Sequence, residues 1–503
     1  MFSIVHSTEK VSSSENRNTE SGLWGFIKLR GVSFIASLLL LVYFGYFVLP
    51  ALNGRFNEDD PMNIYYYWSR GGWEFAKGLV IFFSTYYRPM GGVFFFSLYE
   101  IFGLNPFPYH VVMTFLLLLN VILAYRSAAL LSESKLIGWF TALLITYHAN
   151  MWQLVYLPAF IFDVLCFTFF FSATFYYLRI RVTGVVLNKR QTALFLLLYI
   201  GALEAKEMAV GLPLMLLLYE LIWHWGGHSV QKIRKWISSA ALPSLIAGGL
   251  TFVYILGKSI GVDALSKIDA YRPRYGWHQY YWTSVRFVND IFYRQHDSRI
   301  GMLVLFPALV ILGVVAWRFR NRLLAWAVLF VIITPLPITF IPDRGGAMLY
   351  ITLFGWALMG ASAVIAFCRV FATKIATVRL NPVATEFLLL TLSFIFIWIG
   401  TAHFNKSKQY SIKMSGVQTW SIKEQLETIL RNVKAGDKIA FMNNPFEGRD
   451  WDLLFIAELL CHDHSVKAKM HTMTPLTPEE LAATDYIFAV EGKDKLIVLK
   501  RPQ

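Results

Sequence analysis

The sequence is poor in charged residues and in cysteine. Only 16% of its 503 residues are Asp, Glu, Lys or Arg, whereas 56% are hydrophobic. A soluble domain carries roughly 25% charged residues, so the composition excludes a soluble globular protein and indicates an integral membrane protein. The three cysteines, Cys166, Cys368 and Cys461, lie far apart without the spacing of metal ligands. Two of them fall in apolar runs, where cysteine behaves as a small buried hydrophobic residue.

The net charge of +14 does not indicate a nucleic-acid partner. A nucleic-acid-binding protein gathers its cations on one face. Here the basic residues instead punctuate the gaps between apolar runs, as the positive-inside rule requires of a membrane protein. The sequence therefore predicts membrane lipid, and no nucleic acid, among the partners.

Apolar runs near the roughly 20 residues needed to cross a bilayer recur along the chain. No small-x-small cleavage site follows the first run, so we interpret it as a retained signal anchor. The sequence thus predicts about eleven transmembrane helices. They cover approximately residues 32–50, 108–131, 136–151, 157–178, 191–204, 207–225, 237–257, 300–317, 323–341, 346–368 and 384–402.

The basic clusters give the orientation. They precede the first run and follow the fourth, sixth, eighth and tenth, so all fall on one side if the N-terminus is cytoplasmic. We expect a multi-pass protein of a bacterial inner (plasma) membrane, with its C-terminus outside. Residues 1–31 would be a disordered cytoplasmic segment and residues 32–402 the transmembrane catalytic domain. Residues 403–503 would form a small extracytoplasmic α/β domain, with strands near 438–443, 486–490 and 496–499 and helices near 420–433 and 451–461.

Asp59 and Asp60 stand at the predicted outer mouth of the first span. Pro61 follows them, and Asp before a helix-opening proline is a common N-terminal cap, so capping alone is one interpretation. A functional carboxylate is the other, and both can hold together. The loop that follows, to about residue 107, contains an apolar stretch at 90–102 that is too short to span. We expect it to be a helix lying in the membrane interface.

Further polar residues fall on the same predicted side. Lys206, in the turn with Glu204 and Glu207, is either a ligand or part of a local ion pair. Asp163 lies within the fourth span, where it would either bond between helices or face a cavity. Basic and aromatic residues that suit a phosphate head group complete the set. They are Arg88, which could also snorkel to the interface, Arg272, Arg274 and His278 in the loop 258–299, and Arg344 between spans nine and ten.

The order of these features resembles the GT-C membrane glycosyltransferases. That superfamily includes protein O-mannosyltransferases, the aminoarabinose transferase of lipid A and the oligosaccharyltransferase catalytic subunits. Residues 58–61 look like its acidic first-loop motif, and residues 87–89, 102–106 and 205–207 are similar to segments of its O-mannosyltransferase-like branches. The resemblance covers roughly residues 32–402. The acceptor motif of oligosaccharyltransferases is absent, which disfavours transfer of a whole oligosaccharide to asparagine.

The resemblance implies a GT-C-like α-helical polytopic fold and a sugar donor linked to polyprenyl phosphate. The sugar would pass, with inversion, to a hydroxyl of a protein or glycolipid acceptor at the outer face. Asp59 or Asp60 would be the general base, which typically contributes about 10²–10⁴-fold, and one of the two would hold a divalent metal if any is used. No other cofactor is expected. The donor phosphate or substrate would be bound by Arg88, Lys206, Glu207, Arg272, Arg274, His278 and Arg344.

Two other classes stay open at this point. A polytopic transporter or lipid flippase would use Asp163 and Glu207 as coupling carboxylates. Transporters usually show paired halves with broken helices, and the sequence has no such internal repeat. The second alternative is a non-catalytic GT-C relative that serves as an assembly partner.

Overall fold

The computed structural model describes residues 34–57, 59–81, 87–225, 227, 229–260, 267, 272–294, 299–341, 344–375, 382–446 and 451–502. The predicted disordered segment 1–31 and Glu58 of the acidic motif lie outside these residues.

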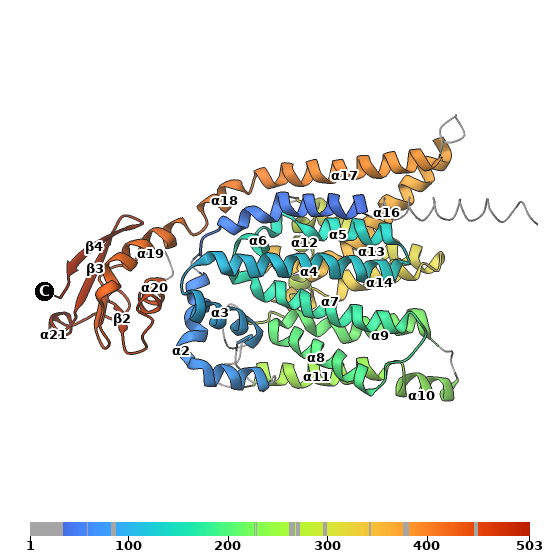
Figure 1. The fold of residues 1–503 in the computed structure, drawn as a ribbon. Helices are drawn as coiled ribbons and strands as arrows, with labels where there is room; N and C mark the ends of the chain where they lie inside the picture. Colours follow the sequence, from blue (N-terminus) through green and yellow to red (C-terminus); the bar gives the residue numbers. More distant parts are fainter. Residues whose placement is uncertain are drawn as a thin grey trace, which may run out of the picture.

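A bundle of apolar helices makes up most of the molecule, and a small α/β domain lies beyond one end of it (Figure 1). Among the described residues, eight helices are long and apolar enough to cross a membrane. The chain is therefore a multi-pass integral membrane protein. The eight are Phe34–Asn53, Pro106–Ser132, Pro158–Arg181, Glu207–His224, Leu242–Ser259, Arg322–Thr339, Gly346–Lys374 and Ala384–Lys406.

Each of these eight helices coincides with one of the predicted spans. The other three predicted spans coincide with helices too, namely α5 (Lys135–Thr146), α8 (Lys189–Ala205) and α13 (Arg299–Arg318). Apart from the first span, the eight candidate spans correspond to α4 (Pro106–Ser132), α7 (Ile161–Arg181), α9 (Leu212–His224), α11 (Leu242–Ser259), α14 (Arg322–Ile333) with α15 (Leu336–Thr339), α16 (Tyr350–Ile375) and α17 (Pro382–Lys406). The bundle also contains α6 (Gln153–Tyr156), α10 (Val230–Ser238) and α12 (Trp277–Ile291).

The centre of the bundle is α7. The span that contains it is 67% buried, whereas the span of α17 is 11% buried and runs along the outside of the bundle (Figure 1). Aromatic rings fill the space around α7, with Phe167 stacked on Tyr350 at 4.2 Å and Phe171 against Phe354 at 4.4 Å. Because lipid tails are as apolar as these side chains, the close packing itself stabilises the bundle.

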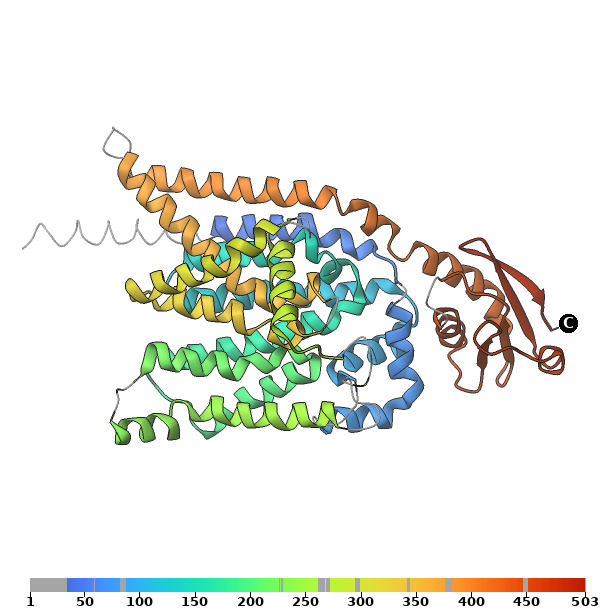
Figure 2. The ribbon, with the colours of Figure 1, turned by 180° about the vertical axis from the view of Figure 1, so that it is seen from behind.

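Two further helices, α2 (Asp59–Val80) and α3 (Pro89–Phe102), lie between the bundle and the α/β domain (Figures 1 and 2). The helix predicted over residues 90–102 is α3. Its Gly91 lies so close to the ring of Phe162 that an added Cβ would clash with that ring, so glycine allows α3 to pack on α7. The chain of α2 bends at Gly71, whose φ of 77° is left-handed and favours glycine.

The α/β domain has a four-stranded sheet of order β2-β1-β3-β4. The first three strands are parallel and β4 is antiparallel to β3. Strands β1, β3 and β4 fall where the sequence predicts them, whereas β2 was not predicted. The elements are α18 (Gln409–Met414), α19 (Val417–Ile429), β1 (Lys438–Phe441), α20 (Asp452–Cys461), β2 (Lys467–Met470), α21 (Pro478–Ala482), β3 (Tyr486–Glu491) and β4 (Lys495–Lys500).

Candidate functional site

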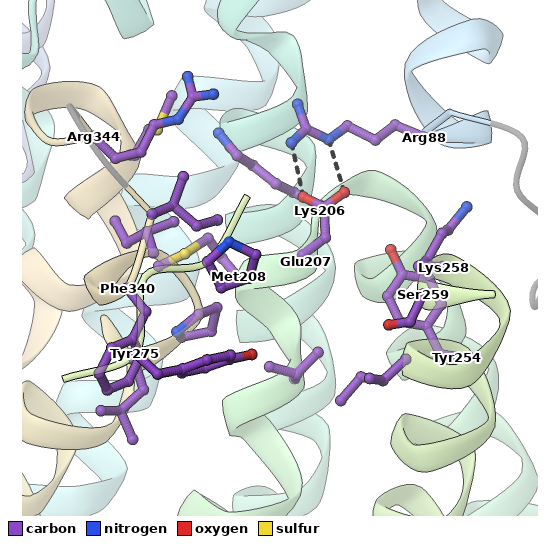
Figure 3. Close-up of a pocket in the computed structure, with 18 residues that line it drawn as sticks. Arg88, Lys206, Glu207, Met208, Tyr254, Lys258, Ser259, Tyr275, Phe340 and Arg344 are labelled. Carbon is purple, nitrogen blue, oxygen red and sulfur yellow. Dashed lines mark hydrogen bonds and ion pairs between the residues drawn. The ribbon is translucent and has the colours of Figure 1, made fainter. Parts of the chain in front are cut away.

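A cavity of about 320 Å³ opens at the end of the bundle that faces the α/β domain (Figure 3). Its walls are mostly apolar. Four cationic side chains nevertheless line it, Arg88, Lys206, Lys258 and Arg344, together with the carboxylate of Glu207. They come from the start of α3, the α8–α9 junction, the end of α11 and the segment before α16. The cavity is thus both apolar and strongly cationic.

Arg88 is fixed in place by its neighbours. It is buried, and its backbone has a left-handed φ of 42° just before α3 begins. Its guanidinium donates to Glu207 from Nη2 at 2.7 Å and from Nε at 3.3 Å, while Nη1 donates to the Tyr87 hydroxyl at 2.6 Å. The Arg88 carbonyl accepts from Tyr67 at 2.9 Å. Arg88 is therefore a buried, paired residue rather than one that snorkels to the interface.

Lys206 forms an ion pair across two helical segments. Its Nζ donates to both carboxylate oxygens of Asp163 at 2.7 Å, and each side chain is 5% exposed. The partner is therefore neither Glu204 nor Glu207, its neighbours in sequence. The same contact bonds α7 to the junction between α8 and α9, so Asp163 acts between helices and also lies beside the cavity.

The wall formed by α11 holds residues that the sequence analysis missed. Tyr254, Lys258 and Ser259 line the cavity there (Figure 3). Glu204 interacts electrostatically with Lys258 and is buried. Neither oxygen of the Glu204 carboxylate has a hydrogen-bond partner within the described part of the chain. The sequence feature that could have identified this wall is the positive charge of Lys258, which directly follows the predicted span 237–257.

Three of the predicted phosphate ligands do not line this cavity. Arg272, Arg274 and His278 are exposed. The backbone N–H of Arg274 donates to the carbonyl of Phe340 at 2.8 Å, so its loop forms part of the cavity wall while its side chain is exposed. The His278 ring accepts from the indole of Trp282 at 2.7 Å. Of the seven predicted ligands, the structure brings together Arg88, Lys206, Glu207 and Arg344.

The acid pair occupies the first turn of α2. The Asn57 side chain accepts from the backbone N–H groups of Asp59 and Asp60 at 3.1 and 3.2 Å, and Oδ2 of Asp60 accepts from the Asn57 N–H at 2.7 Å. This reciprocal pair is a capping box, in which Asn57 is the cap. Asp60 is fully buried, and burial raises its pKa well above the usual value, with a smaller contribution from the negative charge of Asp59. Asp59 is half-exposed.

Neither acid is among the residues that line the cavity. Asp60 nevertheless lies near the backbone of Ala159, at the start of the span that contains α7, and this backbone offsets part of the rise in the pKa of Asp60. Asp163 follows Ala159 by four residues, which is roughly 6 Å along a helix axis. The acid pair therefore lies about one turn beyond the Asp163–Lys206 ion pair.

The described residues contain no group of three or more His, Cys, Asp and Glu side chains that would hold a metal ion. Asp59 and Asp60 supply two carboxylates, and one oxygen of Asp60 is engaged in the capping box. The metal that the sequence analysis allowed at this pair stays a prediction, and no step proposed below involves it.

The α/β domain contacts α2 two turns beyond the acid pair. The Tyr65 hydroxyl donates to Oε2 of Glu458 at 2.8 Å, and the Tyr65 ring stacks on Phe455 at 4.6 Å. Trp68 stacks on His464 at 4.1 Å. His464 is thus engaged with an aromatic ring at the domain contact, and α2 is held between the domain and the bundle.

No protein-family model matches the chain, and no curated protein matches it by sequence. Among solved structures, the chain is similar to the crystal structure of ArnT from Cupriavidus metallidurans bound to undecaprenyl phosphate. The two are 13% identical with a TM-score of 0.46, and the match covers 94% of this chain and 99% of that chain. A similarity of this size assigns no residue and no activity. What this chain itself places at the end of its bundle is a cationic, apolar-walled cavity beside an acid pair.

Proposed function

We propose that the protein is a GT-C type membrane glycosyltransferase, which takes a sugar from a polyprenyl-phosphate-linked donor and transfers it to an acceptor hydroxyl. The observation that carries the proposal is the cavity. Its four cations suit the phosphate of such a donor, and its apolar walls suit the first units of a polyprenyl chain. Both requirements are met in one cavity of a membrane-spanning bundle.

Arg88 and Lys206 have the roles of phosphate ligands. Glu207 pairs with Arg88 and Asp163 pairs with Lys206, so neither cation needs to reorganise as the phosphate leaves. Donors fixed in advance stabilise the charge that grows on the departing phosphate oxygen. Lys258 lines the wall of the same cavity that α11 forms. The cations thus surround the leaving group from separate helices.

Asp59 has the role of general base, because it is the more exposed of the two acids. Its carboxylate takes the proton of the acceptor hydroxyl while that oxygen attacks the anomeric carbon. The bond from that carbon to the phosphate oxygen breaks, and polyprenyl phosphate leaves with the electron pair. A single in-line displacement inverts the anomeric configuration. Asp60 fixes the first turn of α2 through the capping box and so positions Asp59.

The acceptor is a protein or glycolipid hydroxyl that arrives from the side of the α/β domain. We place this side outside a bacterial inner membrane and the N-terminus in the cytoplasm. A membrane-impermeant thiol reagent applied to cells should modify a cysteine at Ser415, in the α/β domain, and should not modify one at Ser229, before α10. Modification of the Ser229 position alone would reverse the topology and contradict the proposed site.

Polyprenyl phosphate is released whichever sugar is transferred, so its binding tests the proposed activity without knowledge of the sugar. Purified full-length protein in nanodiscs should bind polyprenyl phosphate, and Lys258→Gln should weaken binding. Asp59→Asn should bind normally but release no polyprenyl phosphate from a panel of radiolabelled sugar donors. Lys232→Gln, an exposed cation on α10 at the far end of the bundle, is the control. Equal binding by the Lys258 and Lys232 variants would contradict the proposed phosphate site.

One observation favours a transporter as a second candidate. The buried carboxylate of Glu204, with no hydrogen-bond partner in the described ranges, resembles a coupling carboxylate of a proton-driven carrier. A lipid flippase would move polyprenyl phosphate between leaflets without any acceptor. Transfer between leaflets that stops in Glu204→Gln, combined with no sugar release, would favour the transporter over the glycosyltransferase.

A further inference from the structure

A second cavity, of about 460 Å³, lies between the first helix (Phe34–Asn53), α4 and α5. We call it the lipid-facing groove. Its Arg126 is near the end of α4 and its Lys135 begins α5, both far from the α/β domain (Figures 1 and 2). The groove therefore belongs to the opposite membrane side from the catalytic cavity, and no part of the proposed reaction uses it.

The groove is apolar along its length and cationic at one end. Leu40, Phe44 and Leu118 line its apolar part. Arg126 and Lys135 line the end, both are exposed, and no carboxylate is among the lining residues. Within the described ranges, neither cation forms an ion pair. A ligand that complements the groove has an anionic head and a long apolar tail.

The dimensions match one membrane leaflet. Leu118 and Arg126 are eight residues apart on α4, which corresponds to roughly 12 Å along the helix axis. Half of a typical hydrocarbon core is about 15 Å thick. A phosphate held at Arg126 would therefore place an acyl chain along the groove as far as Leu118, close to the bilayer centre.

The rim of the groove is ordered at the level of the head group. The indole N–H of Trp139 donates to the carbonyl of Ala36 at 2.7 Å and so bonds α5 to the first helix. Tyr125 also lines the groove at this level. Aromatic residues of this kind favour the membrane interface, where one end of the side chain is apolar and the other is hydrated.

We propose that this groove binds one anionic phospholipid from the leaflet opposite the α/β domain. Its phosphate contacts Arg126 and Lys135, and one acyl chain lies between α4 and the first helix. A transmembrane helix of a second copy is a poorer occupant. Arg126 and Lys135 would then be covered by that helix, and no carboxylate lines the groove to neutralise them. A zwitterionic lipid would bring a positive group to the same two cations.

Native mass spectrometry of the full-length protein, released from nanodiscs that contain phosphatidylglycerol and phosphatidylcholine, tests the site. The wild type should retain one phosphatidylglycerol in preference to phosphatidylcholine. Arg126→Gln/Lys135→Gln should weaken that retention by about tenfold or more. The matched control is Lys232→Gln/Lys235→Gln, which removes two exposed cations of α10 at the same end of the bundle and should retain the lipid.

A second pair of variants separates the groove from its charges. Leu118→Trp fills the groove and should displace the lipid, whereas Phe115→Trp, on the exposed face of α4, should not. Equal loss in both double charge variants, or equal retention of the two lipids, would overturn the proposal. A dimer mass that disappears only in Leu118→Trp would also overturn it, because the groove would then hold a second copy.

Discussion

Removing Lys206 alone should destabilise the protein more than removing Lys206 and Asp163 together. Nζ of Lys206 is 2.7 Å from both oxygens of Asp163, and each side chain is 5% exposed. Lys206→Met leaves the Asp163 carboxylate buried without its cation, which costs about 3–5 kcal/mol. The double variant Lys206→Met/Asp163→Asn leaves no buried charge at these two positions and should regain most of that free energy of unfolding.

A double-mutant cycle measures the difference. The free energy of unfolding is determined by denaturant titration in detergent micelles for the wild type, the two single variants and the double variant. The rate of sugar transfer is then measured for the same four proteins. If Lys206 binds the leaving phosphate, the double variant regains stability without regaining transfer.

The ion pair of Arg181 and Glu220 is the matched control. It joins α7 to α9 at the other end of the bundle, with the guanidinium nitrogen 2.6 Å from the carboxylate, and it is as deeply buried. The double variant Arg181→Met/Glu220→Gln, which removes both charges of this pair, should regain stability and should also retain sugar transfer. Native transfer by the double variant at Lys206 and Asp163 would refute the role of Lys206 and leave the pair purely structural.

Three further predictions concern other parts of the site. Asp60→Asn should raise the thermal midpoint of unfolding at pH 8 and leave it unchanged near pH 4. The pKa of Asp60 is raised in the folded state, so its carboxyl group destabilises the fold once the pH exceeds the ordinary pKa of an aspartate in the unfolded chain, and asparagine removes this penalty. Arg344→Gln should lower kcat/KM for the donor by a factor that corresponds to about 1–3 kcal/mol of transition-state stabilisation, as expected for a lost charged hydrogen bond. Arg274→Gln, outside the cavity, should change kcat/KM little in the same kinetic assay. Tyr65→Phe should lower the free energy of unfolding by about 1 kcal/mol, because it removes the hydrogen bond to Glu458, and hydrogen exchange of the backbone amides of α20 should become faster.

The transmembrane helices could be predicted because length and hydropathy are local properties. Each apolar run of the sequence coincides with a helix of the structure. The full extent of α2 could not be predicted, since Gly71 interrupts it and its aromatic face is stabilised by α3 and α20. Strand β2 was missed for a similar reason. Lys467 and Lys469 alternate in it without a hydrophobic pattern, and its pairing with β1 defines it.

The site could be predicted only in its parts. Motif order and sidedness gave Arg88, Lys206, Glu207 and Arg344, and all four line the cavity. Their pairing could not be foreseen, because Arg88 and Glu207 are 119 residues apart and no local pattern joins them. Charge and predicted sidedness also selected Arg272 and Arg274, since neither feature reports which way a loop side chain points.

The two halves of the proposed site belong to different parts of the molecule, and α2 sets the distance between them. The cations lie on the bundle helices, whereas Asp59 and Asp60 lie on the first turn of α2. The α/β domain clamps that helix two turns further on, through Tyr65 and Trp68. Gly71 then bends the chain, so the clamped half of α2 is short and its direction follows from the domain contact. The α/β domain therefore holds the helix that carries the acid pair, and none of its described side chains is among the residues that line the cavity.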